Sequence, residues 1–413
     1  MKKKKKENFN YYLFIITIYL LIFQNIIETF FQPMKYFDEV LSLLCIPIIV
    51  ITLIKKKQKT VFKKDDLIML LLLFSLYVIG MYSSLKYMYQ PIDIALSDSL
   101  LVFKFFLVYI MSNHILTEEY IELKRFKINK HIKFIVILLF FLTICNYVFK
   151  VWPVSNYRFG IMTNKLFYGH PTNLSAICIF LISLLILTSK KESKNHIYIF
   201  FLFIILLSTL RFKAIGAAII VLLIIIYIKR TNKKLSLGKV GFLGVIAILL
   251  VWNSISYYYI SFDGSARKVL NDTSIEIAKD YFPIGTGFGT FGSYFSTVSY
   301  SPIYLKYGIN NIYGLTNGNA IFVSDTFWPM IIGQFGIIGT ICYILLIFHI
   351  YRKIQNEYDF ENTNMYIAKM ICFIYLIISS TSESSFVNPI SIPLALIIGI
   401  NIFNKKGLIN EEK

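Results

Sequence analysis

The chain has 413 residues, of which 56% are hydrophobic and only 16% are charged, and its mean hydropathy is +0.64. Soluble domains carry about 25% charged residues, so this composition excludes a soluble globular domain. The formal net charge of +19 comes from lysines and arginines that lie mostly between apolar segments. That placement is typical of the loops of membrane proteins and argues against a nucleic-acid partner.

Apolar segments recur along the whole chain, and a helix needs about 20 such residues to cross a bilayer. We therefore predict an all-α polytopic membrane protein with about 12 transmembrane helices, in which 1–413 is a single integral membrane domain. The lysines at 2–6 precede the first apolar run without a cleavage site, which favours a first transmembrane helix over a signal peptide. The predicted helices, in chain order, are 11–31, 37–54, 66–83, 93–112, 132–149, 171–188, 196–210, 214–228, 239–260, 327–350, 365–381 and 389–403.

Lysine and arginine are unequally distributed over the two sides of these predicted helices. Of the 42 lysines and arginines, eleven lie on one side, and Lys104 and Lys369 fall within predicted helices. Cytoplasmic loops carry an excess of basic residues, so we predict that both termini are cytoplasmic. The basic side holds 29 of the 42, in the segments 1–10, 55–65, 117–133, 190–195, 229–239, 352–353 and 404–413.

The longest polar stretch, 261–326, falls on the predicted extracytoplasmic side and forms one large loop. Long loops with turn residues are where function is usually found. Gly287, Gly289 and Gly292 match a GxGxxG pattern, but no βαβ unit surrounds them, so we reject a dinucleotide site. We expect these glycines to form a tight turn at the membrane surface.

Three arginines lie on the predicted outer side, where basic residues are disfavoured. They are Arg158, Arg211 and Arg267. A guanidinium holds phosphate oxygens with two parallel hydrogen bonds. The helices that flank Arg211 are predicted to have about 15 residues each, which is too few to span a bilayer. We therefore expect the connection between them, which carries Arg211, to lie at head-group depth near an anion or a wet cavity.

Two further residues are candidates for proton transfer. His170 precedes a helix that opens with Pro171, and it either caps that helix or belongs to an anion site there. Asp325 either caps the helix that follows the long loop or has a catalytic role. Glu383 lies just beyond a predicted helix on the outer side and could face the same cavity.

Charged groups and cysteines also fall inside the predicted helices. Asp98, Lys104 and Lys369 are functional candidates, although internal pairing explains them equally well. The five cysteines lie in apolar segments and form no CxxC pair, so we expect buried, unpaired thiols and neither a disulfide nor a metal site.

Three blocks of the sequence follow one another in a distinctive order. An Arg-x-Gly pattern at 158–160 precedes the Pro-x-Asn opening of a helix at 171–173, and a Ser/Thr-x-x-Arg tip follows at 208–211. A third segment runs from Arg267 through 280–291 and ends in the glycine-rich 333–339. On a scaffold of a dozen helices these blocks, which cover about half of the chain, resemble the O-antigen and capsular polysaccharide polymerase family, which shares a superfamily with the O-antigen ligases.

This resemblance implies a GT-C-like glycosyltransferase in the bacterial cytoplasmic membrane that needs no metal or cofactor. Its substrates would be undecaprenyl-diphosphate-linked oligosaccharides, and its partners a chain-length regulator and a flippase. A sugar hydroxyl of one repeat unit would attack the anomeric carbon of the growing chain and release undecaprenyl diphosphate. We expect Arg158, Arg211 and Arg267 to bind the diphosphate, with Arg211 also catalytic and with Asp325 or His170 deprotonating the acceptor.

Other functions remain open. Ligase-like members carry a histidine pair near the end of the large loop, which this chain lacks at 319–325, so polymerase is favoured over an O-antigen-ligase-type transferase and the base is unassigned. A polysaccharide flippase or other transporter would place polar sites at broken helices in related halves, and no such halves are evident. A scaffold in an assembly complex would need larger cytoplasmic loops. The sugars, their linkage and the oligomeric state are not predicted.

Overall fold

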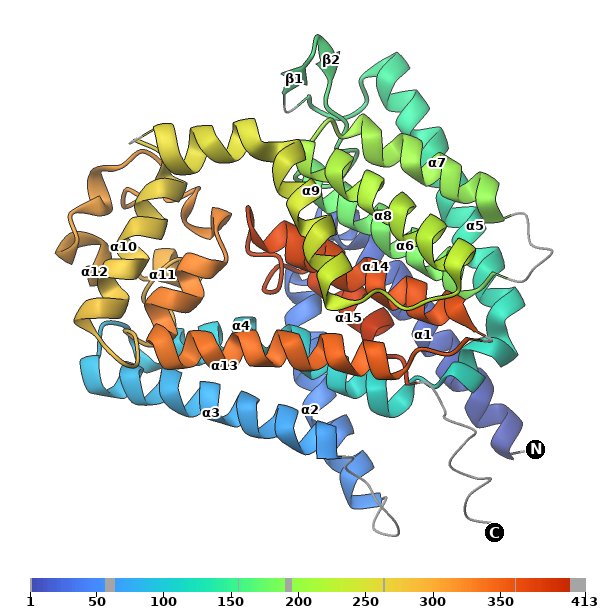
Figure 1. Cartoon of the computed structure of the whole chain (residues 1–413), viewed down its shortest axis with the longest axis horizontal. Helices are drawn as coiled ribbons and strands as arrows, with labels where there is room; N and C mark the ends of the chain where they lie inside the picture. The colour runs from blue at the N-terminus through green and yellow to red at the C-terminus, as the bar shows by residue number, and fades with distance from the viewer. Residues whose placement is uncertain are drawn as a thin grey trace.

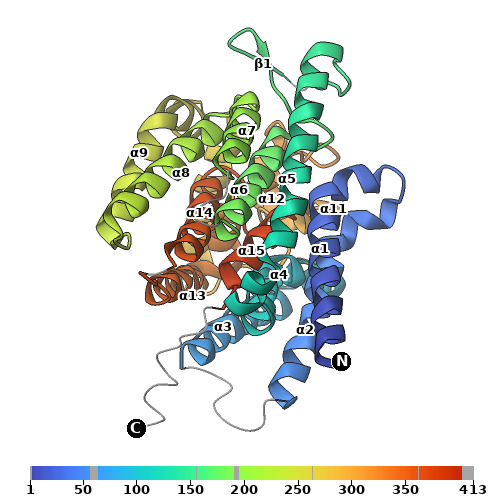
Figure 2. The same ribbon diagram turned by 90° about the vertical axis from the view of Figure 1, so that its right-hand side faces the viewer.

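The computed structural model describes residues 2–55, 64–154, 156–189, 195–262, 264–360 and 362–401. In these ranges the protein is predominantly helical, with one two-stranded sheet (Figures 1 and 2). Its α-helices are α1 (Lys2–Glu28), α2 (Phe37–Lys55), α3 (Lys64–Tyr87), α4 (Ile92–Ile115), α5 (Glu118–Phe149), α6 (Pro171–Leu187), α7 (Asn195–Ser208), α8 (Phe212–Thr231), α9 (Leu237–Ile255), α10 (Ala266–Asp280), α11 (Phe295–Val298), α12 (Pro302–Lys306), α13 (Trp328–Asn356), α14 (Thr363–Ser380) and α15 (Ser391–Gly399).

Shorter elements join these helices. The strands β1 (Tyr157–Arg158) and β2 (Ile161–Met162) pair antiparallel in a hairpin that projects from the top of Figures 1 and 2. The remaining elements are η1 (Gln32–Tyr36), the π-helix η2 (Ser256–Ser261), η3 (Ile309–Asn311) and η4 (Val323–Asp325).

The apolar segments form helices as predicted, and the protein is an all-α, multi-pass membrane protein. Among the described residues, seven helices are long and apolar enough to cross a bilayer, namely α1, α3, α4, α5, α8, α13 and α14. Shorter apolar helical stretches lie in α6, α7 and α9. The total of about twelve spans, the sidedness and the two cytoplasmic termini stay predictions, and the basic segment 404–413, with much of 55–65 and 190–195, lies outside the described residues.

The lengths of the helices that flank Arg211 differ from the prediction. Helix α7 has 14 residues, but α8 has 20 and is about 30 Å long at 1.5 Å per residue. The expectation that both helices are too short to span is therefore wrong for α8. The reason is that the helix-forming residues Lys229 and Arg230 continue the helix beyond the apolar run. The helix ends only at Asn232, which adopts the left-handed conformation.

The glycine-rich segment of the long loop packs into a break in α13. Gly336 has φ 60° and ψ −161°, which interrupts the helix. The loop satisfies the freed backbone groups: Thr286 N donates to Gly333 O at 3.0 Å, and Ile338 N donates to Pro283 O at 3.2 Å. The loop and the break thus form one interlocked unit.

The predicted turn at Gly287 and Gly289 forms, with φ of 97° and 69°, and it is buried within the protein. Phe288 N donates to Ser84 Oγ of α3 at 2.9 Å, and Gly289 N donates to Asp98 Oδ2 of α4 at 2.8 Å. Side chains from two helices therefore hold this turn in place.

The lysines within the helices are paired internally. Lys104 Nζ of α4 lies 2.5 Å from Asp38 Oδ2 of α2, and both side chains are fully buried. Lys369 of α14 forms an ion pair with Glu357 and donates to the carbonyl of Ile400. These ion pairs lie in the core, and a structural role therefore explains both lysines. The five cysteines are free thiols; three are buried as expected, whereas Cys145 and Cys342 are only partly buried.

Candidate functional site

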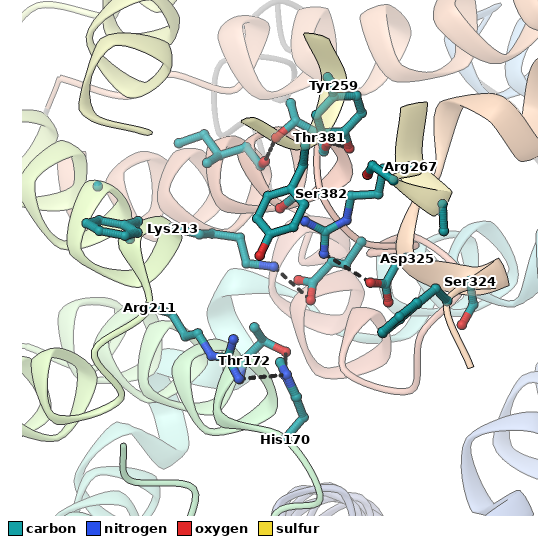
Figure 3. Close-up of a pocket in the computed structure, with 18 of the residues that line it drawn as sticks. His170, Thr172, Arg211, Lys213, Tyr259, Arg267, Ser324, Asp325, Thr381 and Ser382 are labelled. Carbon is teal, nitrogen blue, oxygen red and sulfur yellow. Dashed lines mark hydrogen bonds and ion pairs between the residues drawn. The ribbon is translucent and has the colours of Figure 1, made fainter. Parts of the chain in front are cut away.

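A cavity of about 780 Å³ lies where the β1–β2 hairpin, the N-termini of α6 and α8, η2, α10, η4 and the α14–α15 connection converge (Figure 3). All five candidate site residues line it, namely Arg158, His170, Arg211, Arg267 and Asp325. Glu383 lines it as well. Residues that are up to 225 positions apart in the chain therefore share one chamber.

Local backbone structure places the first two arginines. The turn of the hairpin is made by Phe159 and Gly160, both with positive φ, and it presents Arg158 from β1. Arg211 is the N-cap residue of α8 and follows Leu210, which has φ 50°. Arg158 Nη1 donates to the carbonyl of Leu210 at 3.4 Å, so the hairpin and the α7–α8 tip hold the two guanidiniums in the same region of the cavity.

His170 caps α6 and also contacts Arg211. Its Nδ1 lies 2.7 Å from Thr172 Oγ1 and 3.3 Å from Thr172 N, and its Nε2 lies 3.0 Å from Arg211 Nη2 (Figure 3). A guanidinium only donates hydrogen bonds, so Nε2 is the acceptor, and in the neutral ring Nδ1 carries the proton and donates to Thr172 Oγ1. The surrounding protein and the nearby Arg211 lower the pKa of His170 to about 4, so the ring is neutral at pH 7.

Arg267 and Asp325 form an ion pair. Arg267, in the first turn of α10, donates to Asp325 Oδ2 at 3.0 Å, and its guanidinium lies 5.1 Å from the centre of the Tyr258 ring. Burial raises the pKa of Asp325, and the charge of Arg267 opposes this shift. Helix α13 begins at Trp328 with Phe327 as its N-cap, so the alternative that Asp325 caps this helix is wrong.

A second ion pair was not predicted. Lys213 Nζ, from the first turn of α8, lies 2.8 Å from Glu383 Oε2, and the two side chains are only 13% and 12% exposed (Figure 3). The sequence carried a signal for Lys213, because it follows Arg211 by two residues at the same helix start. No local pattern indicated its carboxylate partner, which lies 170 positions away.

The cavity carries more positive than negative charge. Two of its four cations are matched by carboxylates, whereas Arg158 and Arg211 form no ion pair with any described residue. Burial, together with the nearby Arg158 and Arg267, lowers the pKa of Arg211, although a guanidinium stays charged in proteins. Arg211 Nε is also buried and without a hydrogen-bond partner in the described structure. The two guanidiniums thus offer donors and charge to an anion.

One wall of the cavity is apolar. Gly216 of α8, Gly244 and Ile248 of α9, and Ile377 and Ile378 of α14 line it. Helices α8 and α14 are among those that are apolar enough to cross a bilayer. The chamber therefore joins a cationic region to a surface that suits a hydrocarbon chain.

The described residues contain no group of three or more histidine, cysteine, aspartate or glutamate side chains arranged to hold a metal ion. No protein-family model matches the chain, and no curated protein matches it either. The chemistry of the cavity is therefore the basis on which its function is inferred.

Proposed function

We propose that this protein is a polysaccharide polymerase that joins oligosaccharide repeat units carried on undecaprenyl diphosphate. The observation that carries the proposal is the pair of guanidiniums, Arg158 and Arg211, without carboxylate partners in a cavity with an apolar wall. A lipid diphosphate needs both features, because its head group is anionic and its tail is hydrocarbon.

The reaction requires stabilisation of a departing diphosphate. The acceptor hydroxyl forms a new bond to the anomeric carbon of the donor chain, the bond from that carbon to the phosphate oxygen breaks, and the electron pair leaves with undecaprenyl diphosphate. Arg158 and Arg211 would bind the developing charge with charge-assisted hydrogen bonds. Arg267 contributes positive potential, but Asp325 already occupies its guanidinium.

The acceptor hydroxyl must lose a proton in the same step. His170 is poorly suited to this role, because its Nε2 accepts from Arg211 and Nδ1 of the neutral ring carries the proton. The carboxylates that line the cavity, Asp325 and Glu383, are better suited. His170 would instead orient the Arg211 guanidinium.

The location of the reaction belongs to the same proposal. With 261–326 on the outer face and both termini cytoplasmic, the cavity would open to the outer leaflet of the bacterial cytoplasmic membrane. The architecture would be GT-C-like. A flippase would deliver the lipid-linked repeat units, and a chain-length regulator would act on the product.

The purified protein, reconstituted with one lipid-linked repeat unit, tests the activity. We expect a ladder of polymer lengths without a second acceptor, since a polymerase lengthens its own substrate and a ligase does not. Arg211→Ala should reduce the rate about 100- to 1,000-fold, the usual effect of removing one donor to a developing anion. Arg211→Lys should recover only part of it, because lysine cannot make the bidentate contact.

Arg230→Ala is the matched control, since this exposed arginine lies at the opposite end of the same helix. A normal ladder from Arg211→Ala would remove Arg211 from the mechanism. Labelling of cysteines introduced at Tyr313 and at Ser324 with an impermeant reagent tests the sidedness. Labelling from the cytoplasmic side alone would refute the proposed orientation and favour a transporter.

A further inference from the structure

Glu383 occupies a central position among the charged groups of the cavity. It lies in the connection between α14 and α15, and Lys213 holds its Oε2 at 2.8 Å. It lines the same cavity as His170, Arg211 and Asp325, and its negative charge opposes the lowering of the pKa of His170 and of Arg211. A carboxylate in this position faces the region where the two unpaired guanidiniums would hold a diphosphate.

Backbone contacts fix this position. Ser384 Oγ donates to Ser324 O at 2.8 Å and to Thr326 O at 3.2 Å, so the segment with Glu383 lies directly beside the segment with Asp325. Tyr259 of η2 donates to the carbonyl of Thr381 at 2.7 Å from the other side. The carboxylate is thus held by the scaffold and does not sit on a free loop.

The two oxygens of Glu383 have different surroundings. Oε2 accepts from Lys213, whereas Oε1 is buried and receives no hydrogen bond from any described residue. A buried acceptor without a donor is costly, and the cost is larger for a charged group. A ligand hydroxyl directed at Oε1 would remove this cost, so the protein favours a donor at this point.

The other candidate bases have different partners. Asp325 is held by a guanidinium, which stays charged and binds carboxylates in a fixed geometry, whereas Glu383 is held by an ammonium on a flexible stem. The Nε2 lone pair of His170 is taken by Arg211. Glu383 therefore keeps an oxygen available beside the cationic region of the cavity.

We propose that Glu383 is the general base of the transfer reaction and that Lys213 is its positioning residue. This inference rests on the proposed polymerase function. The acceptor hydroxyl would transfer its proton to Glu383 as its oxygen bonds to the anomeric carbon, and the electron pair of the broken bond would leave with the diphosphate. The proton then passes from Glu383 to water, which restores the carboxylate for the next cycle.

The test compares Glu383→Gln with Asp325→Asn in the reconstituted polymerisation assay. Each change removes one carboxylate charge and keeps the size of the side chain. We expect Glu383→Gln to lower kcat about 100- to 10,000-fold, the range of general-base catalysis, with little change in the KM for the lipid-linked donor. Asp325→Asn should retain a larger share of the activity.

The pH profile separates a base from a structural residue. Activity should fall at low pH in the wild type and in Asp325→Asn, because a protonated carboxyl cannot accept a proton, and this acid limb should disappear in Glu383→Gln. Glu383→Asp, which keeps a carboxylate, should retain the limb at a reduced rate even if Glu383→Gln fails to fold. The charged and titratable groups that face Glu383 are Lys213 and Arg211 near the start of α8, His170 at α6, Asp325 in η4 and Tyr375 of α14.

Two results would overturn the inference. One is a Glu383→Gln rate within threefold of the wild type with the acid limb intact. The other is loss of the limb in Asp325→Asn alone, which would assign the base to Asp325. A wild-type protein that forms no polymer would instead refute the proposed function. Binding of undecaprenyl diphosphate to Glu383→Gln, measured by native mass spectrometry, should stay within threefold of the wild type.

Discussion

Gly336→Ala tests whether the break in α13 organises the large loop. The backbone at Gly336 has φ 60° and ψ −161°, a region open essentially to glycine alone. A Cβ there would lie 2.4 Å from Gly285 N and 2.8 Å from Pro283 O. Both are backbone atoms, so no side-chain rotation can relieve the clash.

The expected cost follows from these contacts. Backbone strain of this kind costs about 1–3 kcal/mol. The clash also forces apart the hydrogen bonds between the break and the loop, from Thr286 N, Gly287 N and Ile338 N, each worth about 0.5–1.5 kcal/mol. We expect Gly336→Ala to lower the free energy of unfolding by about 3–6 kcal/mol. Arg267 and Asp325 belong to this loop, so activity should fall with stability.

Denaturation in detergent micelles, followed by tryptophan fluorescence, measures the effect. Gly241→Ala in α9 is the control, because a Cβ there meets no atom within 4 Å. Alanine at a helical position should stabilise the protein by about 0.5–1 kcal/mol. A Gly336→Ala protein within 1 kcal/mol of the wild type would refute the interlocked break and loop.

Three further predictions follow from the described contacts. Lys104→Met should lower the free energy of unfolding by about 3–5 kcal/mol, because it leaves the buried Asp38 unpaired, and adding Asp38→Leu should recover most of the loss in the same denaturation assay. Asp98→Ala should cost about 1–3 kcal/mol, because Gly289 N loses its acceptor; an unchanged denaturation midpoint would argue against this contact. Folding lowers the pKa of His170, so the folded protein binds fewer protons and its stability should fall as the pH drops from 6.5 to about 4. Ring ¹⁵N shifts of His170 that titrate near 6.5 would contradict the lowered pKa.

The helices were predictable because each apolar run is long and is bounded by polar or basic residues. The ends were less predictable, since they depend on a few local residues. Helix α8 continues through Lys229 and Arg230, which favour a helix once it has begun. Helix α15 has nine residues and is shorter than the predicted span 389–403. Residues 389–390 form a turn, and the chain leaves the helix at Ile400, after which Asn401 forms a β-bridge with Thr117.

The break in α13 was not predictable from the sequence. Gly333, Gly336 and Gly339 are spaced within one apolar run, and glycine is common in transmembrane helices. Nothing local distinguishes Gly336 from the other two. Its conformation depends on the distant loop at 283–287, which supplies the replacement hydrogen bonds.

The candidate site, like the fold, was predictable only in part from the sequence. The three arginines were identified because basic residues are unusual on the predicted outer side, and the structure places them around one cavity. Their pairing was not predictable, because Lys213 meets Glu383 and Arg267 meets Asp325 only through tertiary packing. These pairs leave Arg158 and Arg211 as the two guanidiniums of the cavity without a carboxylate partner among the described residues. Charge counting alone does not reveal this distinction.

The central claim is that these two guanidiniums bind a lipid diphosphate. The most direct measurement is the Kd of undecaprenyl diphosphate for the wild type and for the Arg158→Ala/Arg211→Ala double variant, with Arg230→Ala as the control. Charge-assisted hydrogen bonds contribute about 1.5–3 kcal/mol each, so the double variant should bind about 100- to 10,000-fold more weakly. A double variant that binds within threefold of the wild type would contradict the account.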